Sequence, residues 1–207
     1  MSKTYYDTPL WDSSLSIEER LDYLLSEMTL EEKIQSMGTG NPEIERLGVP
    51  AFQVGGEAAH GVQARHDQKF DDNEPDLTTI FQNPIGMSAS FDEELIRKAG
   101  KVVGTEVRGL YSREHKGSLS VWAPTIDMER DPRWGRTEEA YGEDPLLTGK
   151  MAGAYVEGLQ GEDDHYLLTA ATLKHFLLIM WRKGVFGSRR PFLQEINGSI
   201  IWNHFVR

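Results

Sequence analysis

The clearest indication of the fold lies in residues 119–173, which begin with the apolar run LSVWAPTID (119–127). This run predicts a strand, and a long polar loop follows it. Asp144 then supplies a helix N-cap with proline in the first helical position, so PLLTGKMAGAYVEGL (145–159) predicts a helix. A second apolar run, LLTAATL (167–173), predicts another strand. Strand, loop, helix and strand in this order are typical of a parallel βαβ unit, so the sequence predicts an α/β fold.

The alternation continues toward the N-terminus. Thr29 and Glu32 have the spacing of a capping box that opens a helix, and the apolar run at 52–54 predicts a short buried strand. Ser90 and Glu93 have the same capping-box spacing ahead of a predicted helix that ends near residue 111. The chain has 207 residues, whereas a (β/α)8 barrel typically takes about 250. The alternation again favours parallel βαβ units, and the length is marginal for a complete barrel of this kind.

Composition narrows the class of protein. The chain is 39% hydrophobic and 27% charged, as expected for a soluble globular domain. A net charge of −11 argues against nucleic acid or an anionic membrane as the main partner. The chain has no cysteine, no apolar run long enough to span a bilayer and no signal-peptide pattern at its N-terminus. We expect a cytoplasmic protein, and an exported precursor stays open as an alternative.

Four polar segments follow predicted strands, where α/β barrels carry their active sites. One of them, TEEAYGEDP (137–145), is assigned a structural role. In GGEAAHG (55–61), Glu57 is either an acceptor for ligand hydroxyls or a solvated turn residue. In APTIDMERDPRWGR (123–136), the arginines either hold a ligand or stiffen the loop by ion pairs, and we expect some of each. In TLKHF (172–176), Lys174 and His175 would point to opposite sides of a strand unless a bend or an unusual peptide bond brings them together.

Together these segments resemble the N-terminal domain of glycoside hydrolase family 3, which includes β-glucosidases and β-xylosidases. The segment LLSEMTLEEKI (24–34) resembles the entry helix of that family, and FQNPIG (81–86) with SFD (90–92) resembles two of its landmarks. The most specific match is RDPRWGR (130–136), followed by LKHF (173–176). The resemblance runs from about residue 5 to residue 176, so we assign residues 1–176 to a partial family 3 barrel domain. It implies the N-terminal part of a (β/α)8 TIM-like barrel, incomplete in this chain.

The resemblance implies that Glu57, Arg136, Lys174 and His175 contact the non-reducing-end sugar of the substrate. It also implies an enzyme that hydrolyses O-glycosyl bonds of β-glucosides or β-xylosides by a retaining mechanism, with one carboxylate as nucleophile and another as acid/base. The family's nucleophile is an Asp in a Ser-Asp-Trp-like setting, and nothing in this sequence matches it. We therefore assign no catalytic carboxylate, no metal and no cofactor, and we expect a small carbohydrate as the partner.

Residues 177–207 differ in character from the rest of the chain. They hold five of the 22 Lys and Arg residues but one of the 33 acidic residues. When the codons of the tail are read one base out of register, they permit the sequence Tyr-Tyr-Leu-Glu-Pro-Phe-Arg. The codons of Trp202 and Asn203 leave glutamate as the only possible residue at its position. This amino-acid sequence is similar to that of the family. We hypothesise a frameshift near Leu178, with a divergent natural tail as the alternative.

The chain as given is therefore expected to be inactive, and unstable or prone to aggregate, because a barrel cut after three or four strands has open edges. Two other possibilities remain: a non-catalytic carbohydrate-binding remnant and a pseudogene product.

Overall fold

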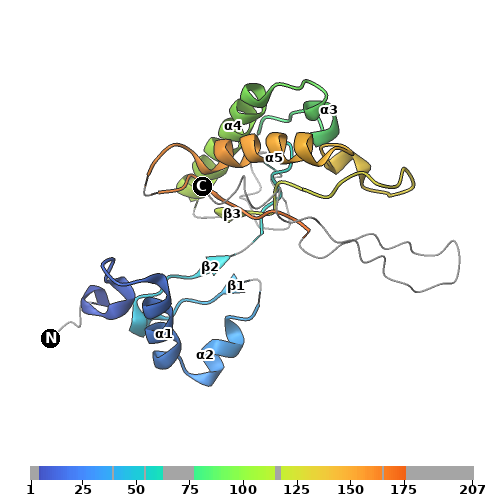
Figure 1. Cartoon of the computed structure of the whole chain (residues 1–207). Helices are drawn as coiled ribbons and strands as arrows, with labels where there is room; N and C mark the ends of the chain where they lie inside the picture. The colour runs from blue at the N-terminus through green and yellow to red at the C-terminus, as the bar shows by residue number, and fades with distance from the viewer. Residues whose placement is uncertain are drawn as a thin grey trace, which may run out of the picture. The chain divides into compact units, whose positions relative to one another are not determined.

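The computed structural model describes residues 5–38, 40–53, 55–62, 77–114, 118–164 and 166–175 (Figure 1). The predicted out-of-frame tail, 177–207, lies outside the described residues. The chain divides into two compact units, Met1–Val54 and Gly55–Arg207. Within the described residues, no helix is both long enough and apolar enough to cross a membrane.

The first unit is built from short elements. These are the 3-10 helices η1 (Tyr5–Asp7), η2 (Pro9–Trp11) and η3 (Glu45–Leu47), helices α1 (Ile17–Glu27) and α2 (Leu30–Gln35), and strands β1 (Gly40–Asn41) and β2 (Phe52–Gln53). Capping boxes open both α-helices. Thr29 accepts a hydrogen bond from the Glu32 N–H and the Glu32 carboxylate accepts one from the Thr29 N–H, as predicted. Ser16 and Glu19 do the same for α1.

The strand predicted at 52–54 is present as β2, but the expectation that it is buried is wrong at Phe52. Strand β2 pairs with β1 in an antiparallel ladder of two residues, with Phe52 opposite Asn41. A ladder this short covers little side-chain surface, and Phe52 remains 46% exposed. The apolar run was too short for its composition to distinguish a core strand from the arm of a small hairpin.

The second unit contains the predicted βαβ unit. Its elements are α3 (Pro84–Ser88), α4 (Glu93–Glu114), β3 (Ser120–Val121), η5 (Thr137–Glu139), α5 (Pro145–Gln160) and β4 (Ala170–Ala171). Strands β3 and β4 are parallel, with Ser120 opposite Ala170, and a further parallel bridge joins Thr125 to Lys174. Because α5 connects these two parallel strands, the α/β prediction is confirmed.

Local signals set where the two long helices begin. Asp144 caps α5 as predicted, since its carboxylate accepts the Leu147 N–H at 2.7 Å. The capping-box prediction for α4 is wrong in its residue: Asp92 accepts the Leu95 N–H at 3.0 Å, while the Ser90 hydroxyl accepts the Asp92 N–H. An aspartate two residues beyond the serine was the stronger acceptor at that position.

Helices α4 and α5 pack closely along each other (Figure 1). Glycines permit this approach: a Cβ at Gly158 would lie 2.2 Å from the Arg97 carbonyl oxygen, and a Cβ at Gly100 would lie 2.4 Å from the Tyr155 carbonyl oxygen. No side chain fits at either distance. The two helix backbones therefore touch, and α5 also packs against β4.

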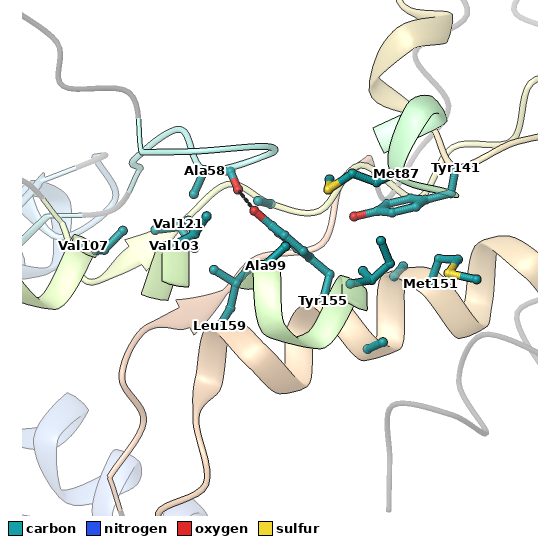
Figure 2. Close-up of a cluster of buried hydrophobic side chains, with 14 residues drawn as sticks. Ala58, Met87, Ala99, Val103, Val107, Val121, Tyr141, Met151, Tyr155 and Leu159 are labelled. Carbon is teal, nitrogen blue, oxygen red and sulfur yellow. Dashed lines mark hydrogen bonds between the residues drawn. The ribbon is translucent and has the colours of Figure 1, made fainter. Parts of the chain in front are cut away.

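The core of the second unit lies between this helix pair and β3. Figure 2 shows Tyr155 at its centre, with its hydroxyl directed toward Ala58. That hydroxyl donates a hydrogen bond of 2.6 Å to the Ala58 carbonyl oxygen. The contact ties α5 to the segment that immediately follows Glu57, so the core fixes the position of a predicted site residue.

Candidate functional site

Parallel pairing brings the ends of two strands together. Beyond β3 and β4, the Ile126 N–H donates to the Lys174 carbonyl oxygen at 2.7 Å, and the Lys174 N–H donates to the Pro124 carbonyl oxygen at 3.1 Å. Asp127 and His175 come directly after these pairs. Because parallel strands present their carboxyl ends at one edge, the side chains of Asp127 and His175 meet there.

A third segment reaches the same edge. The Gly55 N–H donates to the Ser120 carbonyl oxygen at 3.3 Å, and the Trp122 N–H donates to the Gly56 carbonyl oxygen at 2.7 Å. Gly55 has φ +101°, and a Cβ there would lie 2.8 Å from the Trp122 ring, so only glycine fits this approach. The turn delivers Glu57 next to the ends of β3 and β4.

Lys174 and His175 both turn into this cluster. Lys174 Nζ lies 3.1 Å from Glu57 Oε2, and His175 Nδ1 lies 2.7 Å from Asp127 Oδ2. The peptide bond between the two residues is cis. Of the two arrangements that the sequence left open, the structure therefore has the one with both side chains at one site.

Arg136 completes the cluster from the loop after β3. Its guanidinium forms a bidentate ion pair with Glu139, and its NH1 group lies 3.3 Å from His175 Nε2. The ion pair raises the pKa of Arg136 and lowers the pKa of Glu139, with Lys174 adding to the effect on the carboxyl. Both groups are therefore charged at neutral pH.

The other arginines of the loop differ from Arg136. Arg133 pairs with Asp131 at 2.6 Å, and its side chain is 65% exposed, as expected of an ion pair that stiffens a loop. Burial lowers the pKa of Arg130, an effect that the nearby Asp127 opposes. Arg133 therefore has the loop-stiffening role expected for some of these arginines, and Arg136 lies in the candidate site.

The cluster is suited to holding an uncharged ligand with several hydroxyl groups. Three carboxylates, from Glu57, Asp127 and Glu139, alternate with two cations and an imidazole, and the side chains are mostly shielded from solvent. Such groups donate and accept in fixed directions, as sugar hydroxyls require. Among the described residues, no group of three or more acidic or histidine side chains could hold a metal ion.

Comparison with known sequences identifies the family. Residues 29–178 match the glycosyl hydrolase family 3 N-terminal domain. The chain belongs to glycosyl hydrolase family 3. The resemblance predicted from the sequence is thus confirmed over most of the chain.

Similar family 3 proteins include several xylosidases. The exo-1,4-beta-xylosidase bxlB of Emericella nidulans is 39% identical over 82% of this chain, and the beta-xylosidase/alpha-L-arabinofuranosidase 1 of Medicago sativa is 43% identical over 80%. Each match covers 22% of the relative, so the chain spans about a fifth of the length of these family 3 proteins.

Solved family 3 structures agree in fold. The exo-beta-xylosidase XlnD, in complex with a xylobiose aziridine probe, superposes with a TM-score of 0.71 at 36% identity, over 82% of this chain and 22% of that one. The beta-glucosidase 3B of Thermotoga neapolitana, in complex with α-D-glucose, gives 0.62 at 28% identity, over 77% and 23%.

The structure gathers all four predicted residues of this family 3 chain, Glu57, Arg136, Lys174 and His175, and adds two that were missed. Asp127 was not singled out in its loop, and Glu139 lies in the segment 137–145, which was assigned a structural role. The spacing of Arg136 and Glu139 by three residues was a usable signal, because the two lie across η5. Nothing local linked Asp127 to His175, since 48 residues separate them.

Proposed function

We propose that Glu57, Arg136, Lys174 and His175 bind the non-reducing-end sugar of a β-glycoside, and that the parent protein hydrolyses such glycosides with retention of configuration. The observation that carries this proposal is the convergence of four residues from three distant segments on one edge of the parallel strands. A surface ion-pair network would not need segments more than 100 residues apart, as Glu57 and Lys174 are.

The ion pairs themselves prepare the site for a neutral sugar. In the free chain, Lys174 and Glu57 hold each other, with side-chain exposures of 16% and 32%. A bound sugar would bridge the two by accepting a hydrogen bond from the ammonium and donating one to the carboxylate. Charge-assisted bonds of this kind contribute about 1.5–3 kcal/mol each, so losing one partner weakens binding about tenfold or more.

A β-xyloside is our preferred substrate for the parent, with a β-glucoside as the alternative. The curated relatives named above are xylosidases, and Glu57 stands where many β-glucosidases of the family have the shorter aspartate. The parent fold we propose is a (β/α)8 barrel, because β3, α5 and β4 form one of its βαβ repeats and the site lies at the carboxyl ends of the strands. A cytoplasmic location is part of the same proposal.

The bond-breaking step belongs to other residues. Retaining enzymes place two carboxyl groups about 5–5.5 Å apart across the scissile bond. In this site Glu57, Asp127 and Glu139 are each engaged by a cation or by the imidazole, so they serve to hold the site and not to attack the sugar. We assign the nucleophile and the acid/base to a part of the parent beyond residues 1–176.

Saturation-transfer NMR with methyl β-D-xyloside and methyl β-D-glucoside tests the proposal, because it observes the ligand whether the chain is monomeric or associated. We expect saturation of the xyloside by the full chain. The affinity for the xyloside should fall tenfold or more in Lys174→Met and should not change in the surface variant Lys150→Met. Equal saturation by the wild type and Lys174→Met would refute the sugar site. An assay with an aryl β-xyloside should show no turnover.

A further inference from the structure

The imidazole of His175 is held from both sides. Its Nδ1 lies 2.7 Å from Asp127 Oδ2, and its Nε2 lies 3.3 Å from Arg136 NH1. The same Asp127 oxygen accepts the backbone N–H of His175 at 3.2 Å. The side chains of Asp127 and His175 are only 12% and 15% exposed, so water competes little for these contacts. Both the position and the rotation of the ring are therefore set by groups of the protein.

The donors and acceptors around the ring permit one tautomer. A carboxylate only accepts hydrogen bonds, so Nδ1 must carry the proton that it shares with Asp127. A guanidinium only donates, so Nε2 must present a lone pair to Arg136. The tautomer with the proton on Nε2 would direct N–H toward N–H on one side and a lone pair toward a carboxylate on the other.

We propose that Asp127 is a positioning residue that fixes His175 as its Nδ1–H tautomer and so keeps Nε2 as a hydrogen-bond acceptor beside a guanidinium donor. Two guanidinium groups, those of Arg130 and Arg136, also attract the Asp127 carboxylate. Among the described residues, His175 Nδ1 has a hydrogen bond to Asp127 and to no other side chain.

The arrangement has a consequence for specificity, which rests on the proposed function. A lone pair at Nε2 and an N–H of Arg136 side by side complement a group that donates and accepts at once. A sugar hydroxyl does both, whereas a fluorine or an ether oxygen only accepts. The edge of the site formed by His175 and Arg136 would therefore select a free hydroxyl of the bound sugar.

Solid-state NMR of the full chain labelled with 15N-histidine tests the tautomer directly and does not depend on solubility. His175→Gln identifies the signals of His175 among those of the six histidines. We expect Nδ1 protonated and Nε2 unprotonated at neutral pH. A wild-type spectrum with the proton on Nε2 overturns the proposal, whatever the variants show.

Two variants separate positioning from simple support of the fold. Asp127→Ala removes the acceptor, so the Nε2–H form should become populated. Asp127→Asn keeps a carbonyl acceptor and should restore the wild-type tautomer. The control Asp131→Ala, in the same loop, should leave the spectrum unchanged. An Asp127→Ala spectrum identical to that of the wild type would also overturn the proposal.

A ligand series distinguishes this proposal from the sugar site on which its consequence rests. In this series, each xyloside has one hydroxyl replaced by fluorine. With the wild type, the replacement at one position should reduce saturation transfer. With Asp127→Ala, the same replacement should cause no further reduction. If no xyloside binds while the Nδ1–H tautomer is found, the proposed function fails and the positioning role stands. If xylosides bind with the proton on Nε2, the positioning role fails and the proposed function stands.

Discussion

Two buried tyrosines in the same core have hydroxyls in opposite situations. The Tyr155 hydroxyl donates to the Ala58 carbonyl oxygen, whereas the Tyr141 hydroxyl has no hydrogen-bond partner among the described residues. Tyr155→Phe should cost about 1–3 kcal/mol of unfolding free energy, because it leaves a buried carbonyl unpaired. Tyr141→Phe should be neutral or stabilising. Urea unfolding at low protein concentration measures both, and an equal loss in the two variants would contradict the difference.

The same tyrosines predict sensitivity to alkali. Burial raises the pKa of both hydroxyls well above the ordinary value of about 10. The folded chain therefore favours the neutral forms, and this contribution to stability is complete below pH 10 and is lost as the pH rises further. The unfolding free energy should fall by at most about 1.4 kcal/mol per pH unit for each tyrosine. Urea unfolding at pH 9, 10 and 11 measures the slope, which Tyr141→Phe should reduce.

At the scale of elements, the contact between α4 and α5 depends on glycine. Gly158→Ala would place a Cβ 2.2 Å from the Arg97 carbonyl oxygen, so the helices must separate, at a cost of about 1–3 kcal/mol or more. Gly153→Ala in the same helix meets nothing within 4 Å and should stabilise α5 by about 0.5–1 kcal/mol. Thermal unfolding followed by circular dichroism compares the two. Similar melting temperatures would mean that the helices do not pack as described.

The elements also show what sequence patterns can predict. The βαβ unit was predictable because Asp144-Pro145 marks a helix start and apolar runs flank that helix. The exposure of Phe52 in the strand predicted at 52–54 was not predictable, because three residues carry no periodicity and tertiary pairing decides their burial. The residues of the candidate site were likewise predictable only in part. Glu57, Arg136, Lys174 and His175 were found by resemblance, whereas the role of Asp127 depends on a contact between distant loops.

At the scale of the molecule, apolar side chains lie open on the first unit. Neither α1 nor α2 contains a buried residue, and Ile17, Leu21 and Leu25 repeat at helical spacing with exposures of 49–66%. Such a stripe favours association. Sedimentation velocity should show self-association that increases with concentration and decreases in the triple variant Ile17→Gln/Leu21→Gln/Leu25→Gln. A monomer that unfolds cooperatively at every concentration would contradict this prediction.

The hypothesis of a frameshift also belongs to the whole molecule. It predicts that the DNA downstream of codon 178, read in another frame, encodes a family-like sequence that reaches a Ser-Asp-Trp-like nucleophile strand. Sequencing the gene tests it, and a stop codon within a few triplets of that frame would end it. An open frame would also supply the parent protein whose hydrolysis of β-xylosides is proposed above.

The sugar site itself can be located by dipolar contacts between ligand and protein. Solid-state NMR of the chain, with 13C-labelled xyloside and 15N-labelled lysine and histidine, measures which nitrogens lie within a few ångströms of the sugar carbons. We predict dephasing of the sugar signals by Lys174 Nζ and by the His175 ring, with loss of the lysine contribution in Lys174→Met and its retention in Lys150→Met. A bound sugar without these contacts would contradict the assignment of this edge of the strands as the sugar site.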